Sequence, residues 1–355
     1  MSSRFAWFLL VAACGSSSRP GSDALAPPDA ARDAAAGDSA ADDAVPADGA
    51  PVGYQHAPIY YTADGLTFQL PLERRTPTVF GAAGATVALL PSPSRRRLAQ
   101  RFQDGSVNVY TAEGRELAFF QDQASLLGWI GEEDFLLYNR TTLSFRRVRL
   151  DGSEGRNLPN PIAGPTTSQW VVLSPDGALL ALVGSAAPAM PASLRTVSVM
   201  TTSDGTVTNR FEVPAILGPV WTQDGTLVWV EGRLLARADL DQGTKSLTPL
   251  PFEPCSLDAW AGPTVRLGTQ VLREDVYACN RYFSAGADGS VAALDWLNVR
   301  LNVPIATTLP LTVSPDGKKI AVYGIVNGGL NLVNPDGTGD ENLVPSPGAV
   351  STLGW

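Results

Sequence analysis

The residue types that carry most acid–base and nucleophilic catalysis are scarce in this 355-residue sequence. His56 is the single histidine, and it precedes the strand-rich part of the chain. A Ser-His-Asp or Cys-His arrangement would therefore lack its base within a folded domain, and no Gly-x-Ser-x-Gly nucleophile motif occurs. No phosphate-binding glycine loop precedes a helix-like segment. We expect a protein that is not an enzyme and that carries no cofactor.

Carboxylate pairs are the remaining route to catalysis, as in glycosidases. Glu132/Glu133 and Glu274/Asp275 are adjacent pairs. Adjacent residues on a strand point to opposite faces, so neither pair forms a facing dyad by itself. We interpret both pairs as solvated turn charges. A glycan hydrolase or lyase stays open as an alternative if carboxylates from several strands converge at one pocket.

One acidic segment, Asn334–Glu341, places oxygen-bearing side chains around two glycines, as calcium loops do. Asp336 and Asp340 are the candidate ligands. The segment lacks the spacing and the terminal bidentate Glu of an EF-hand. A plain turn between strands is the favoured interpretation, because the same position in other repeats holds simple Asp-Gly turns. We therefore expect no metal site.

The N-terminus has the layout of a secretory signal: Arg4, then an apolar run over residues 5–13, which is too short for a permanent membrane span. Leu10-Val11-Ala12-Ala13-Cys14 resembles the bacterial lipobox. The resemblance implies that residues 1–14 are a signal peptide and that Cys14 is lipidated. A plain secretory signal with an incidental cysteine, or a buried apolar segment, is the alternative. Gly15, where inner-membrane retention signals of enteric lipoproteins carry Asp, implies an outer-membrane anchor, with the protein facing the periplasm or the cell surface.

Residues 15–56 are composed of Ala, Asp, Pro, Gly and Ser with almost no large apolar residue, and they hold seven Asp against two Arg. Such a segment cannot bury enough surface to offset the entropy of ordering it, so we expect a disordered tether. The whole chain has a net charge of −9 and only three lysines, which argues against nucleic acid as a partner.

From residue 57 to residue 355 the sequence shows short apolar runs separated by turns, and no long stretch at helical spacing. Ser174-Pro175-Asp176-Gly177 and Ser314-Pro315-Asp316-Gly317 are near-identical turns between strand-like runs. Pro presets φ for the first central position, and Gly takes the φ > 0 position without steric cost. Asp-Gly turns recur along the chain, at residues 64, 104, 151, 176, 204, 224, 288, 316 and 336. This density predicts an all-β chain of hairpins.

The hairpins recur with a period that fits a four-stranded blade. Repeats begin near Pro91, Trp129, Leu173, Trp221, Trp260 and Val313, at intervals of 38 to 53 residues through to Trp355. Radial stacking of such sheets predicts a β-propeller over residues 57–355. Residues 349–355 look like a first strand without partners, and residues 57–80 look like three strands without a first one. Sharing one blade between them closes the ring and gives seven blades; six is the alternative.

The repeats also carry a family resemblance. Trp221-Thr222-Gln223-Asp224-Gly225 and the two Ser-Pro-Asp-Gly turns resemble the WD40-like (PD40) repeats of TolB-type propellers. The resemblance covers about six repeats over residues 91–355; Ser92-Pro93-Ser94-Arg95 replaces Asp-Gly, and residues 129–133 lack the turn. It implies that the pore faces and inter-blade loops bind other proteins. It also raises the six-blade alternative, which is common among TolB-type propellers.

Cys255 and Cys279 are the other two cysteines, and both lie in the least regular repeat. In an exported protein two such cysteines often pair, so a disulfide is possible in this repeat. Two buried thiols too far apart to bond are the alternative. A zinc site is excluded, because no further Cys or His completes a ligand set.

These observations predict a monomeric, membrane-anchored lipoprotein that presents a non-catalytic propeller to envelope proteins. A carboxylate-dependent glycan hydrolase, lyase or glycan-binding protein using the central pocket is the second hypothesis, and a ligand-sensing or structural surface protein is the third. A cluster of Asp and Glu at one mouth of the channel would favour the second, and an apolar or mixed rim would favour protein binding. The sequence identifies no individual binding residue. We interpret the arginine runs, including Arg95-Arg96-Arg97, as solvated loops and strand edges.

Overall fold

The computed structural model describes residues 57–121, 125–139, 142, 144–151, 155–160, 170–184, 195–214, 216–273, 276–300, 311–324, 329–348 and 350–355. All of them belong to one compact unit, Ala50–Trp355. The predicted signal peptide with Cys14, the predicted tether and His56 lie outside the described residues.

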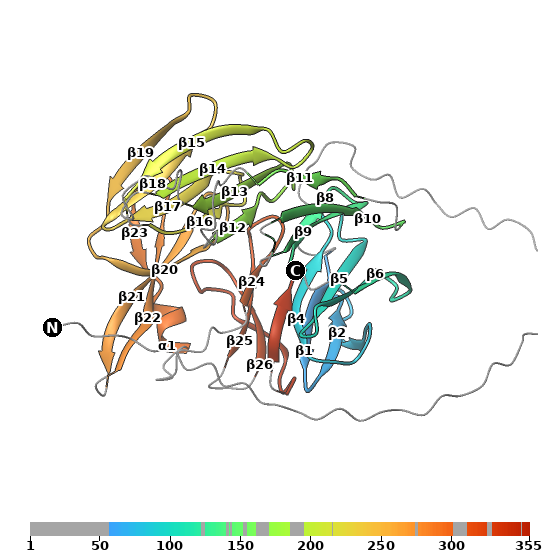
Figure 1. The fold of residues 1–355 in the computed structure, drawn as a ribbon. Helices are drawn as coiled ribbons and strands as arrows, with labels where there is room; N and C mark the ends of the chain where they lie inside the picture. The colour runs from blue at the N-terminus through green and yellow to red at the C-terminus, as the bar shows by residue number, and fades with distance from the viewer. Residues whose placement is uncertain are drawn as a thin grey trace, which may run out of the picture. The chain divides into compact units, whose positions relative to one another are not determined.

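Seven four-stranded antiparallel sheets form the blades of a ring, and six of them use strands that follow one another in sequence (Figure 1). Blade I contains β4 (Thr86–Pro91), β5 (Arg97–Phe102), β6 (Ser106–Thr111) and β7 (Glu116–Gln121). Blade II contains β8 (Ser125–Ile130), β9 (Asp134–Asn139), β10 (Ser144–Arg149) and β11 (Asn157–Leu158). Blade III contains β12 (Trp170–Leu173), β13 (Leu179–Gly184), β14 (Arg195–Thr201) and β15 (Val207–Val213).

The remaining consecutive blades follow the same order. Blade IV contains β16 (Leu217–Trp221), β17 (Leu227–Glu231), β18 (Leu234–Asp239) and β19 (Thr244–Pro249). Blade V contains β20 (Pro254–Ala259), β21 (Val265–Arg273), β22 (Val276–Ala285) and β23 (Val291–Ala293). Blade VI contains β24 (Leu311–Val313), β25 (Ile320–Gly324), β26 (Gly329–Val333) and β27 (Glu341–Val344). First strands of neighbouring blades contact one another, which places them innermost.

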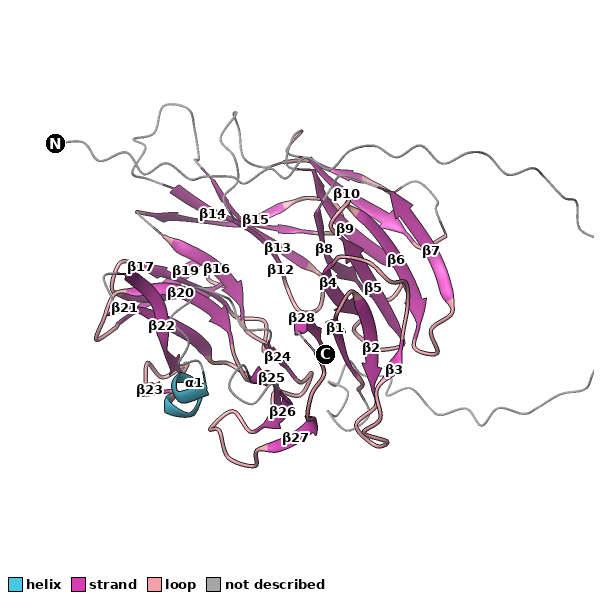
Figure 2. Cartoon of the chain, turned by 90° about the horizontal axis from the view of Figure 1, so that it is seen from below, coloured by secondary structure: helices cyan, strands magenta, loops and turns pink. Residues whose placement is uncertain are grey.

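Blade VII joins the two ends of the propeller sequence. Its order is β28 (Val350–Gly354), β1 (Ile59–Ala63), β2 (Leu66–Leu70) and β3 (Thr78–Val79), with Tyr61 opposite Leu353. Figure 1 shows a red strand from the C-terminal end beside blue β1, and Figure 2 labels it β28. The shared blade and the count of seven are confirmed, and the six-blade alternative is wrong.

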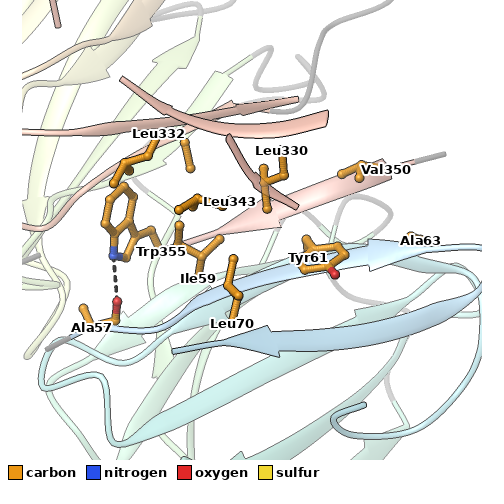
Figure 3. Packing of buried hydrophobic residues seen from close by; sticks show 11 residues of the cluster. Ala57, Ile59, Tyr61, Ala63, Leu70, Leu330, Leu332, Leu343, Val350 and Trp355 are labelled. Atoms are coloured by element: carbon orange, nitrogen blue, oxygen red, sulfur yellow. Dashed lines mark hydrogen bonds between the residues drawn. The ribbon is translucent and has the colours of Figure 1, made fainter. Parts of the chain in front are cut away.

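The core is divided among the seven interfaces between blades, each of which contains one apolar cluster. Between blades VI and VII, Leu330, Leu332 and Leu343 pack against Ile59 and Tyr61 (Figure 3). Because neighbouring blades cover both faces of each sheet, second strands such as β17 are buried along their length and do not alternate. All five residues of β17 are buried.

The turn between the first and second strands has a recurring structure. Ser174 Oγ donates to Asp176 Oδ1 (2.6 Å) and accepts from the Leu179 amide (2.9 Å). Ser314 makes the equivalent bonds in blade VI, to Asp316 Oδ1 (2.8 Å) and from the Lys319 amide (2.9 Å). The serine is buried in both turns, so its hydroxyl satisfies the backbone where water is excluded.

Tryptophans at the ends of first strands connect neighbouring blades. Trp129 Nε1 donates to the Leu90 carbonyl in blade I (2.7 Å), and Trp221 Nε1 donates to the Val172 carbonyl in blade III (3.1 Å). Both indoles are buried. At the ring closure, Trp355 Nε1 instead donates to the Ala57 carbonyl (3.0 Å; Figure 3). These side chains are interior packing residues.

Blade V departs most from the repeat. Its β21–β22 hairpin is the longest of the described hairpins, and a six-residue helix, α1 (Asp295–Arg300), follows β23 (Figure 2). The sequence pattern did not predict this helix, because only one turn and a half of chain is involved. Within the described part of the chain, no helix has the length and apolar character needed to cross a membrane.

Candidate functional site

A pocket of about 370 Å³ lies at the centre of the ring, and we call it the channel pocket. First strands of five blades line it, contributing among others Leu90, Trp129, Leu173, Thr312 and Leu353. Pro93, Arg95 and Pro175 come from turns after the first strands, so the pocket opens on the face that carries those turns. The wall mixes apolar side chains with the polar groups of Arg95, Ser174 and Thr312. Pockets of this size with a few polar groups are typical of ligand sites.

Among the described residues that line the channel pocket, Arg95 is the only charged one. In blade I it occupies the position that Gly177 and Gly317 occupy in the Ser-Pro-Asp-Gly turns. The hairpin requires a left-handed backbone at this position, and Arg95 adopts it with φ of 63°. A non-glycine residue there is strained, and such strain is typical of functional positions. The substitution places a guanidinium at the mouth of the channel.

The electrostatics of the Arg95 side chain are set by its partial burial. Burial lowers the pKa of Arg95 to about 10, and the nearby Glu132 carboxylate partly offsets this effect. The guanidinium is therefore protonated at neutral pH. Its Nη1 is 3.5 Å from the Pro91 carbonyl oxygen, and its Nε is buried without a hydrogen-bond partner among the described residues. An anionic group entering the pocket would satisfy this cation.

Glu132 and Glu133 do not face each other as a catalytic pair; they hold the turn that carries Arg95. Glu132 Oε1 accepts from the Ser94 amide (2.6 Å), and the Glu132 carbonyl accepts from Arg97 Nη1. Glu133 forms an ion pair with Arg97 Nη2 (2.9 Å). Neither glutamate lines the channel pocket. The second predicted pair, Glu274/Asp275, lies outside the described residues.

Asp336, the first of the two weak calcium-ligand candidates, forms hydrogen bonds within its own turn. Asp336 Oδ1 accepts from the Thr338 amide (2.9 Å) and hydroxyl (2.7 Å), and these bonds lower the pKa of Asp336. Asp340 lies four residues further along the chain in the same loop. Among the described residues no group of three or more His, Cys, Asp or Glu side chains could hold a metal ion.

Cys255 and Cys279 form a disulfide, with their Cα atoms 5.9 Å apart. The bridge joins the first and third strands of blade V, and each ladder of β21 has a register shift beside a cysteine. Gly268 on the intervening strand makes room for it, since a Cβ there would lie 2.7 Å from Cys279 Sγ. The bridge belongs to the blade and does not contribute to the channel pocket.

Sequence reasoning missed Arg95, which it assigned to a solvated loop. The structure places Arg95 in the channel pocket and Arg97 in an ion pair, and of the three arginines only Arg96 is exposed. Aligning the turns by sequence would have singled out Arg95, because it stands where the equivalent turns carry glycine. An arginine at a position where equivalent turns carry glycine is unfavourable for folding and calls for another explanation.

Comparisons with known proteins agree with this architecture. No family model matches the chain. No curated protein matches it either. Among solved structures, the Cps50 (Swd1) β-propeller domain of Myceliophteria thermophila matches with a TM-score of 0.53 at 13% identity, over 80% of this chain and 98% of that one. A chain of the structure titled "Crystal Structure of Mitotic Checkpoint Complex" matches with a TM-score of 0.51 at 12% identity, over 76% and 87%. Similarity at this level of identity shows the fold: the chain is a seven-bladed, WD40-like β-propeller.

Proposed function

We propose that the protein is a non-catalytic interaction module that binds another protein of the cell envelope through the channel pocket. The observation that carries this proposal is the composition of the pocket wall. It combines apolar side chains with the polar groups of Arg95, Ser174 and Thr312, and no Asp or Glu is among the described residues that line it. A carboxylate-dependent hydrolase would need two carboxyl groups facing its substrate there.

The chemistry of the pocket defines the group that fits it. An apolar segment of the partner that carries a carboxylate, either an acidic side chain or a chain terminus, would bury its apolar part against Leu173 and Leu353. Its carboxylate would pair with Arg95. Arginine is well suited to this role, because its planar guanidinium can bind a carboxylate in bidentate geometry and is enriched at the energetic centres of interfaces.

Two further considerations support a protein partner. One of the matching chains belongs to a structure whose title names a complex, the mitotic checkpoint complex. The WD40-like turns of this chain also resemble the PD40 repeats of TolB-type propellers, which bind proteins through pore faces and loops. Binding residues on turns held by a rigid scaffold are a common arrangement.

The cellular setting is part of the same proposal. The resemblance of residues 10–14 to a lipobox supports lipidation at Cys14, and the composition of residues 15–56 supports a tether between the anchor and the propeller. We place the anchor in the outer membrane. The propeller would then face the periplasm or the cell surface.

The test compares three tagged proteins in native cells: the unchanged chain, Arg95→Gly and Arg96→Gly. Both variants lose one positive charge from the same turn, but only Arg95 lines the channel pocket. After crosslinking and mass spectrometry, we expect one envelope protein to be enriched with the unchanged chain and with Arg96→Gly, and to be reduced at least tenfold with Arg95→Gly. Equal enrichment with all three proteins, or no enriched protein, would contradict the proposal.

A further inference from the structure

A second pocket, of about 610 Å³, lies on the outer side of the interface between blades VII and I, and we call it the outer groove. One wall is the loop segment 82–85, which leads from β3 to β4. The opposite wall is formed by Phe102 and Asp104 near the β5–β6 turn and by the side chains of Asn108 on β6 and Phe119 on β7. The outer groove shares no residue with the channel pocket.

The outer groove exists because the two blades that border it differ in depth. The fourth strand of blade VII, β3, has only two residues, whereas β7 of blade I has six. The packed part of the interface contains Tyr60, Phe80 and Tyr110. Among the described residues no strand of blade VII covers β7, and Phe119 is left 56% exposed. An aromatic ring with an open face is therefore built into the wall of the groove.

A buried polar network ends at the back of the groove. Tyr110 Oη accepts from Asn108 Nδ2 (2.8 Å) and from the Ala82 amide (3.0 Å). Asn108 Nδ2 also lies 3.4 Å from Glu116 Oε2. Asn108 is 8% exposed, and its Oδ1 is closed off from solvent, with no hydrogen-bond partner among the described residues. The network therefore belongs to the wall of the groove and holds Asn108 in place.

Asp104 supplies an accessible acceptor at the rim of the groove. Its Oδ1 accepts from the Ser106 hydroxyl (2.6 Å) and amide (2.9 Å). These two bonds lower the pKa of Asp104, so the carboxylate is ionised at neutral pH. Its other oxygen, Oδ2, makes no hydrogen bond to a described residue. The groove thus combines a carboxylate with two phenylalanine rings, and no cationic side chain is among the described residues that line it.

We propose that the outer groove binds a neutral carbohydrate. Sugar hydroxyls would donate to the Asp104 carboxylate, and the C–H face of the pyranose would lie on the electron-rich face of Phe119. The absence of a cation among the described lining residues disfavours phosphates and acidic sugars. An extended peptide would need a strand edge to pair with, and the polar groups that β6 and the β5–β6 turn offer here are side chains. The volume accommodates one or two sugar rings.

Titrations followed by saturation-transfer NMR test this assignment, with glucose, galactose, mannose, N-acetylglucosamine and their disaccharides as probes. We expect at least one sugar to bind the unchanged protein. Phe119→Ala removes an exposed ring and should raise the dissociation constant of that sugar at least fivefold, whereas Phe119→Trp should keep or tighten binding. Leu247→Ala is the matched control, because Leu247 is an exposed apolar residue (45%) on the fourth strand of blade IV.

A second variant tests the polar half of the groove. Asp104→Ala should also weaken the sugar at least fivefold, and thermal unfolding checks that the variant is folded. Failure of every sugar to bind, or binding that is unchanged in Phe119→Ala, would overturn the assignment. Binding of apolar peptides in place of sugars, lost in Phe119→Ala, would overturn it as well and make the groove a peptide site. Arg95→Gly should leave sugar binding unchanged, so this result is independent of the fate of the channel pocket proposal.

Discussion

Arg95 in blade I and Gly177 in blade III occupy the same position in equivalent turns, and both have a left-handed backbone, with φ of 63° and 73°. The turn geometry is thus common to the two blades, and only the side chain differs. The guanidinium that this difference supplies is the only charge among the described residues on the wall of the channel pocket.

Arg95→Gly should not destabilise the propeller. Glycine removes the strain of a left-handed arginine, which is about 1 kcal/mol, and its greater freedom in the unfolded chain offsets part of this gain. The free energy of unfolding should be unchanged or rise by up to about 1 kcal/mol, measured by urea denaturation. A loss of more than about 1 kcal/mol would show that Arg95 is needed for folding and would weaken the case for a binding role.

Gly177→Ala and Gly225→Ala should differ in effect. Both glycines have positive φ, so each substitution introduces backbone strain of about 1 kcal/mol. A Cβ at Gly177 would also clash with the carbonyl oxygen of Trp129, whereas a Cβ at Gly225 meets nothing within 4 Å. Chemical denaturation should therefore give a larger loss for Gly177→Ala, by at least about 1 kcal/mol. Equal losses would mean that blades II and III are not packed as described.

Cleavage of the disulfide should destabilise the propeller without changing the channel pocket. The bridged cysteines are 24 residues apart in sequence. A loop of this size predicts a loss of about 3–4 kcal/mol when Cys255 and Cys279 are both replaced by serine. Reducing agent should lower the melting temperature of the unchanged protein and leave that of the double variant unaffected. The same sensitivity to reductant in both proteins would contradict the bridge.

Acid should destabilise the protein through its turn aspartates. Hydrogen bonds from Thr201 and Thr206 lower the pKa of Asp204 from 3.8 to about 2. A carboxyl group with a lowered pKa in the folded state stabilises the fold above its unfolded pKa, and this contribution is lost as the pH falls from about 4 to 2. The melting temperature should decrease more steeply over that window in the unchanged protein than in Asp204→Asn. Parallel curves would contradict this role.

The blade pattern could be predicted from sequence because each blade repeats the same local chemistry. Ser174-Pro175-Asp176-Gly177 and its equivalents encode a turn, and the spacing between such turns encodes four strands. The shared blade followed from simple accounting, since residues 349–355 supplied one strand without partners and residues 57–80 supplied three. The helix α1 was missed because a six-residue segment has too few apolar positions for a helical period.

The candidate sites could not be predicted in the same way. The channel pocket brings together residues as far apart in sequence as Leu90 and Leu353, and no local pattern encodes that proximity. The outer groove depends on the short length of β3, and the ends of strands are the least certain part of a sequence-based prediction. Arg95 was visible as an exception to the turn, but its role required knowledge of what the turn faces.

The most direct test of the account is site-specific photo-crosslinking in living cells, with a photo-reactive amino acid at position 93 in the channel mouth and, as a control, at position 246 on the outer strand β19. The account predicts that position 93 crosslinks one envelope protein, that position 246 does not, and that adding Arg95→Gly abolishes the crosslink while Arg96→Gly leaves it intact. Crosslinks of equal yield from both positions, or a crosslink from position 93 that persists in Arg95→Gly, would contradict the channel pocket as a binding site that depends on Arg95.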